Sequence, residues 1–196
     1  DGSLEAEFGG KYGYVRSNIS HNEADDYKDG SGKSVHSHFK RDSQMLQLGI
    51  TPTENTTIAG TYERSRAKVA YADRMMDGSK FDRDAWNVRF TQRNLTPWFS
   101  ELELRYGESE IDHVMDTYSL RTIRNPAGKQ IKNANNPKRN TDTGRLKATF
   151  DWDNLNLQTG VDYMDDVHVA RMERGGDGYS HKPFMPNQSF KQWGVF

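Results

Sequence analysis

Apolar and polar residues alternate along most of the chain. Between residues 99 and 112, for example, Leu102, Leu104 and Tyr106 are separated by single charged residues. Successive side chains of an extended backbone point to opposite sides, so this pattern predicts strands with one apolar and one polar face. Nine segments show it, namely 3–8, 11–22, 43–51, 56–66, 86–91, 99–112, 145–152, 155–163 and 189–196. No segment has a helical period, and an all-β fold is expected.

The connections between these segments are short and long in alternation. Short turns lie at residues 51–55, 94–97 and 153–154, and long polar connections at 23–34, 68–83, 116–143 and 167–187. A transmembrane β-barrel has this organisation, with short periplasmic turns and long extracellular loops, whereas a soluble sandwich has no reason to keep every second loop long. Aromatic residues near strand ends fit interfacial girdles, namely Trp86, Trp98, Trp152, Tyr163 and Trp193.

The predicted fold class is therefore an antiparallel transmembrane β-barrel segment. Bacterial single-chain barrels have an even number of strands, so about nine strands indicate part of a larger barrel. A soluble β-sandwich or barrel is the alternative fold.

The composition agrees with a barrel and argues against several other classes of protein. Only 33% of the 196 residues are hydrophobic and the mean hydropathy is -0.98, which suits strands that need one apolar residue in two. The net charge is -1 with both signs interleaved, so no nucleic-acid partner is expected. The chain has no cysteine, so it holds no cysteine metal site or disulfide of its own. It also has no hydrolase or phosphate-binding motif, and we do not expect an enzyme.

The candidate chemistry lies where the segment 99–112 runs out into the longest polar connection. His113 and Met115 are two residues apart, so an extended backbone presents an imidazole and a thioether on one side. That pair suits a soft metal such as Cu(I) better than calcium or magnesium. The alternative is that the pair is incidental.

Other histidines and methionines lie mostly in the long connections. Those that could capture metal transiently are Met75, Met76, His168, Met172, His181 and Met185. His36 and His38 also have the spacing of one strand face. A calcium loop beginning near Asp25 is rejected, because His36 falls where the bidentate glutamate should be.

Three stretches resemble the TonB-dependent copper receptors of Gram-negative outer membranes. They are Glu23-Ala24-Asp25-Asp26-Tyr27-Lys28-Asp29-Gly30, Met76-Asp77-Gly78-Ser79-Lys80-Phe81 and Asp112-His113-Val114-Met115-Asp116-Thr117-Tyr118-Ser119-Leu120-Arg121. The resemblance implies a barrel of about 22 strands with an N-terminal plug, importing copper with energy passed from the inner membrane. It implies that His113 and Met115 are copper ligands, and that a Cys-Xaa-Xaa-Xaa-Met motif of the plug supplies two more.

Residues 1–196 are accordingly expected to be part of the barrel domain of such a receptor, without its plug. The expected partners are the outer-membrane lipid bilayer, the TonB system acting through the plug, and copper. Cu(I) is the preferred ion and Cu(II) the second candidate. Two alternatives stay open: a siderophore receptor or porin-like barrel without a metal site, and a soluble β-sandwich binding module.

Overall fold

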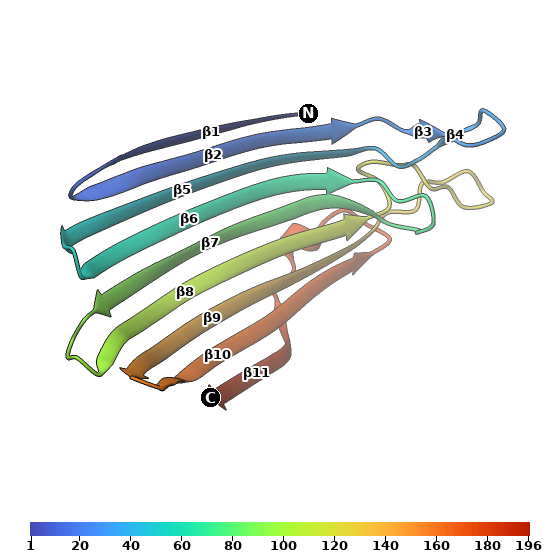
Figure 1. The fold of residues 1–196 in the computed structure, drawn as a ribbon. Helices are drawn as coiled ribbons and strands as arrows, with labels where there is room; N and C mark the ends of the chain where they lie inside the picture. Colours follow the sequence, from blue (N-terminus) through green and yellow to red (C-terminus); the bar gives the residue numbers. More distant parts are fainter.

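One antiparallel sheet of nine strands forms most of the protein (Figure 1). The computed structural model describes residues 1–196, apart from the side chain of Asn187. The sheet strands, in spatial order, are β1 (Gly2–Gly10), β2 (Gly13–Ala24), β5 (Phe39–Thr53), β6 (Thr56–Val69), β7 (Asp77–Arg93), β8 (Phe99–Asp116), β9 (Asn133–Trp152), β10 (Leu155–Arg174) and β11 (Met185–Val195). The connections carry a small hairpin, β3 (Tyr27–Lys28) with β4 (Ser34–Val35), and one 3-10 turn, η1 (Tyr179–His181).

The nine predicted strands are confirmed, but their ends at the long connections are wrong. Strand β9 begins at Asn133, inside the predicted connection 116–143, and β10 continues to Arg174, inside 167–187. The β9 extension is largely polar on both faces, and that of β10 mixes charged residues with Val167, Val169 and Ala170, so neither shows a clear apolar face although the backbone pairing continues. Cross-strand ion pairs accompany the pairing there, such as Arg139 with Asp166 at 2.7 Å and Lys138 with Glu110 at 2.7 Å.

The pairing register places the large apolar side chains on one face of the sheet. Leu48, Ile50, Val88, Leu104, Leu146 and Leu157 are each between 44% and 54% exposed. A continuous apolar face of this extent is unusual on a soluble monomer. Among the described residues the buried apolar side chains are only Ala59, Ala70, Ala85, Val114 and Ala134. One large sheet with a bare apolar face is not a sandwich, so the soluble-sandwich alternative is wrong.

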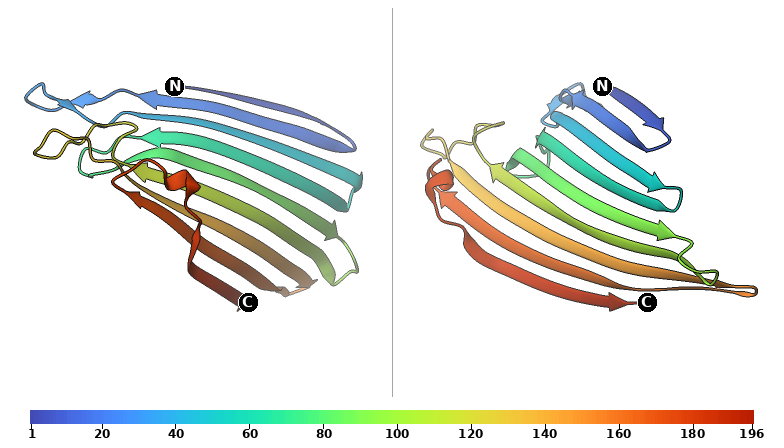
Figure 2. Two further views of the ribbon diagram at one scale, coloured as in Figure 1. Left: turned by 180° about the vertical axis from the view of Figure 1, so that it is seen from behind. Right: turned by 90° about the vertical axis from the view of Figure 1, so that its left-hand side faces the viewer.

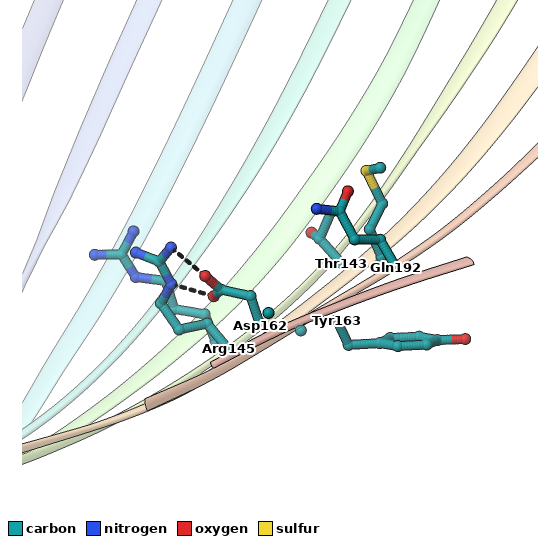
Figure 3. Close-up of a pocket in the computed structure, with 9 residues that line it drawn as sticks. Thr143, Arg145, Asp162, Tyr163 and Gln192 are labelled. Atoms are coloured by element: carbon teal, nitrogen blue, oxygen red, sulfur yellow. Dashed lines mark hydrogen bonds and ion pairs between the residues drawn. The ribbon is translucent and has the colours of Figure 1, made fainter. Parts of the chain in front are cut away.

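The opposite face is polar and lines a trough, because the sheet is curved (Figure 2). Arg145 donates two hydrogen bonds to Asp162 on this face, at 2.5 and 2.9 Å. The next residue, Tyr163, points to the other side (Figure 3). Arg105, Arg145 and Asp162 contribute to a groove of about 500 Å³ here. We call the polar face the inner face and the apolar face the outer face.

Aromatic side chains form two bands on the sheet. At the end with short turns, Phe99 and Phe150 stack with ring centroids 4.8 Å apart, between Trp98 and Trp152. Further along are the pairs Trp86 with Tyr106, at 5.5 Å, and Tyr163 with Trp193, at 4.6 Å.

The polar atoms of the second band point toward the end with long connections. Tyr62, which is opposite Trp86 in this band, donates to Asp84 at 2.8 Å, and Tyr106 donates to Asp142 at 2.9 Å. Both carboxylates lie nearer than their partners to the long connections. Amphipathic rings with apolar bodies on one side and polar tips on the other are the arrangement of an interfacial girdle.

The sheet is open at both edges. Strand β1 pairs only with β2, and β11 only with β10. A free edge presents unpaired backbone groups that can accept another strand, so the sheet is a segment of barrel wall. No helix in the part of the chain that the structure describes is long and apolar enough to cross a membrane.

We predict that a charge is costly on the outer face and tolerated on the inner face. Leu48→Arg, on the outer face, should lower the free energy of unfolding from lipid vesicles by about 2–4 kcal/mol. Gln47→Arg, one residue away on the inner face, is the matched control and should cost about 0.5 kcal/mol. Denaturant titration measures both values, and equal costs would contradict the assignment of the two faces.

Candidate metal site

The end of the sheet that carries His113 and Met115 also holds a buried carboxylate, that of Asp77, the first residue of β7. Its side chain is fully buried. Arg121 donates to it from Nε at 2.7 Å and also from Nη2. His36 Nε2 lies 2.8 Å from it, and the backbone N–H of Tyr71 donates at 2.9 Å. This cluster joins the connections β4–β5, β6–β7 and β8–β9, because each supplies one partner.

Opposing effects act on the Asp77 carboxyl. Burial disfavours its charged form, but the hydrogen bonds from Arg121, His36 and Tyr71 outweigh burial and lower its pKa. Arg121 also donates to the carbonyl oxygens of Tyr71 and Arg74, each at 2.6 Å. The long connections therefore form an ordered rim around the end of β7 and β8.

His113 lies on the inner face of β8, seven residues beyond the aromatic band at Tyr106. Its ring stacks on Phe81 of β7, with centroids 3.8 Å apart. Its Nε2 atom is buried and has no hydrogen-bond partner. Burial lowers the pKa of His113, against a smaller opposing effect of Asp112. A neutral imidazole with a free buried nitrogen is the form that binds a metal ion.

Met115 shares the face of His113. The register of β8 with β9 is continuous here, from Asp112 opposite Lys138 to Met115 opposite Asn135. On the other side Met115 is opposite Gly78, where β7 carries a bulge. A side chain at Gly78 would overlap the ring of Phe81, so this glycine leaves the space in which Phe81 stacks on His113.

Two lower-ranked candidates lie in strand β10, where the sequence predicted a loop. His168 and Met172 are four residues apart on one strand face, because β10 continues to Arg174. Asn135 of β9 is paired with Met172 of β10 on one side and with Met115 of β8 on the other. The two methionines are therefore two strands apart on the inner face, with their backbones about 10 Å from each other. His168 already has a partner, since its Nε2 lies 3.1 Å from Asp166.

The remaining candidates lie around the same end of the sheet. Met75 is 70% exposed and Met76 is half-buried, and both precede Asp77 directly. Met185 begins β11, opposite Ala170 of β10. His181 is exposed in η1. All the candidate methionines therefore lie at the end of the sheet with long connections. His181 lies there too, in the exposed turn η1.

Sequence reasoning missed the role of Asp77 and Arg121. The two residues are 44 positions apart, and no periodic pattern links them. Both were within stretches quoted for the resemblance, but a carboxylate in a polar connection carries no sign that it will be buried.

The geometry defines a class of protein: an all-β, antiparallel transmembrane β-barrel segment with an unpartnered histidine at its long-loop end. The solved structure named "Copper transporter OprC" is similar to this chain, with a TM-score of 0.90 and 33% sequence identity. The similarity covers 98% of this chain and 31% of that chain, so this chain spans about a third of its length. No protein-family model matches the sequence, and no curated protein matches it.

We predict that Asp77→Asn loosens the rim. The amide would leave Arg121 and His36 without their anionic partner, and breaking one side of a buried ion pair costs about 3 kcal/mol. Amide hydrogen exchange at Tyr71 should accelerate on the order of a hundredfold. Asp73→Asn, exposed in the same connection, is the control. Similar exchange in the two variants would show that Asp77 does not hold the rim together.

The same carboxylate predicts an acid sensitivity of the rim. Because the folded pKa of Asp77 is lowered, its stabilising contribution is complete above the ordinary carboxyl pKa of about 3.9. The contribution is lost as pH falls further, through the lower folded value. Limited proteolysis between pH 7 and pH 3 should cut residues 70–76 only at the acid end, with an acid-stable protease. Cleavage that does not change over this range would contradict the expectation.

Proposed function

We propose that this chain is part of the barrel wall of an outer-membrane TonB-dependent receptor that binds and imports copper. Copper is the transported substrate. The observation that carries the proposal is the buried, unpartnered Nε2 of His113 on the face that also presents Met115. The 33% identity to a copper transporter over 98% of this chain supports it.

The donor set favours Cu(I). An imidazole nitrogen and a thioether sulfur are softer ligands than the oxygens that calcium and magnesium require. Cu(II) is the second candidate, because imidazole also suits it. Two ligands leave the coordination incomplete. By the family resemblance, a cysteine and a methionine of a plug domain complete it, and the TonB system acts through that plug in a Gram-negative outer membrane.

The surroundings of His113 suit metal capture. The stacked Phe81 ring fixes the imidazole plane and excludes water from one side. Burial lowers the pKa of His113 and so favours the neutral imidazole, which is the form that binds a metal ion. The side chains that would capture copper transiently on its way to this pair are Met75, Met76, His168, Met172, His181 and Met185.

We predict that His113→Ala and Met115→Ala each weaken Cu(I) binding to the full-length receptor. Loss of a direct ligand should exceed the 10- to 100-fold effect of an outer partner, so we expect about a hundredfold or more. Competition with a Cu(I) chelator in detergent measures the affinity.

His21→Ala is the matched control, because it removes an imidazole that contacts Asp42 and Glu23 and is not a proposed ligand. We expect little change for this variant. Unchanged affinity in His113→Ala/Met115→Ala would refute the copper proposal and favour a siderophore receptor or porin-like barrel.

We also predict that Gly78→Ala weakens copper binding without removing a ligand. The added methyl group would push Phe81 from its place, and His113 would lose the ring that orients it. A loss of about tenfold in Cu(I) affinity is expected, as for an outer-shell partner. Gly10→Ala, where a methyl group meets open space, is the control. Equal affinities of the two variants would show that Phe81 does not position His113.

A further inference from the structure

A second group of metal-binding side chains lies outside the proposed copper pair. Asp26, His36 and His38 each offer a ligand atom, and the three atoms lie within 4.8 Å of one another. The two imidazole rings meet edge to face, with centroids 5.1 Å apart and planes at 88°. These residues flank the small hairpin β3–β4, which projects beyond the end of the sheet with long connections (Figure 1).

The hairpin brings the three residues together. Asp26 directly precedes β3, and His36 directly follows β4. Tyr27 is opposite Val35, so the two ends of the hairpin are adjacent. Asp26 Oδ1 then accepts the backbone N–H groups of Ser37 and His38, both at 2.9 Å. The cluster is therefore fixed by backbone hydrogen bonds and not by side-chain contacts alone.

The hydrogen bonds of Asp26 and His38 leave one possible ligand atom of each residue outside them. Asp26 accepts the hydrogen bonds from Ser37 and His38 through Oδ1, and its Oδ2 takes no part in them. His38 meets Asp26 through Nδ1 at 2.8 Å, so a neutral His38 keeps its lone pair on Nε2.

His36 is oriented by a buried carboxylate. Its Nε2 lies 2.8 Å from Oδ2 of Asp77, which Arg121 also holds. With Nε2–H donating to the carboxylate, Nδ1 of a neutral His36 carries the lone pair. This carboxylate–histidine pairing is the arrangement that orients histidine ligands of metal ions and raises their basicity. Asp77 is followed by Gly78, which is opposite Met115 in the pairing of β7 with β8. The cluster therefore lies at the same end of the trough as His113 and Met115.

The donor set distinguishes among metals. Two imidazoles and one carboxylate suit Cu(II) and Zn(II). Calcium requires six or more oxygens, and Cu(I) prefers sulfur, which this cluster does not offer. The side chains of His36, His38 and Asp26 are 30%, 38% and 34% exposed. A metal ion can therefore reach them from solvent and keep open coordination positions for water.

We propose that Asp26, His36 and His38 form a binding site for a divalent transition-metal ion, Cu(II) or Zn(II), at the outer end of the trough. The site uses other ligands than His113 and Met115 and a harder class of metal ion, so it does not depend on the copper proposal for that pair. Asp77 is its positioning residue.

The test uses the full-length protein in detergent, in the His113→Ala/Met115→Ala background, so that copper at that pair does not contribute. Cu²⁺ should bind with one equivalent and an electron paramagnetic resonance spectrum split by two imidazole nitrogens. His36→Gln/His38→Gln keeps hydrogen-bonding capacity and should lose this signal, with affinity reduced about a hundredfold or more. Asp26→Asn should weaken binding and leave the two-nitrogen pattern in place.

Further variants separate a metal site from a structural role. His21→Ala is the matched control, because His21 contacts Asp42 and Glu23 and is not a proposed ligand, and it should bind as the background protein does. Asp77→Asn should weaken Cu²⁺ binding by about 10- to 100-fold. Zn²⁺ should displace Cu²⁺ only in excess, because such ligands bind Cu²⁺ more tightly, and millimolar Ca²⁺ should not displace it. Heat-modifiable migration on gels checks that each variant is folded. A folded His36→Gln/His38→Gln protein that keeps the two-nitrogen signal overturns the proposal, and so does a background protein that binds no Cu²⁺.

Discussion

The structure depends on the register between neighbouring strands, which is unbroken through the middle of β5 to β8 and shifts only near strand ends, as at Gly78. Side chains alternate between the two faces of a strand, so a slip of one residue would move every apolar side chain from the outer to the inner face. The register from β5 to β8 keeps Leu46 beside Tyr62, Tyr62 beside Trp86, and Val88 beside Tyr106. The apolar outer face, the aromatic bands and the polar trough all follow from this pairing. Few side chains are buried, and the backbone ladder takes the place of a conventional core.

Beyond the aromatic bands the ladder continues without an apolar face to guide it. Salt bridges such as Arg139 with Asp166 lie across these extensions, and Asp77 connects three of the long connections to the end of β7. Because the strands extend, Met115 and Met172 come to share the neighbour Asn135. The ordered rim thus brings together histidines and methionines that are distant in sequence, and they form two candidate sites. In one site the carboxylate of Asp77 orients His36, and in the other the next residue, Gly78, leaves the space in which Phe81 stacks on His113.

The nine strands and the outer face were predictable from sequence because each is a local property. Leu102, Leu104 and Tyr106 alternate with charges whatever their partners are, and a short turn such as 153–154 requires the next strand to return beside the last. The pair His113 and Met115 was predictable for the same reason, since two residues on one strand share a face. The ends of β9 and β10 were not, because polar residues occupy both faces of β9 there and the end of β10 lies within a stretch rich in charged residues.

By itself, then, the sequence determined the strand number, the two faces and the placement of His113 with Met115. Tertiary structure alone decided that Nε2 of His113 is buried without a partner, since this depends on Phe81 from β7 and the space left by Gly78. It also decided that Asp26 meets His36 and His38, and that Asp77 is buried with Arg121. These contacts join residues from 10 to 44 positions apart. Alternation fixes the direction of a side chain from its own strand, but which distant side chain it meets depends on how the connections fold over the sheet.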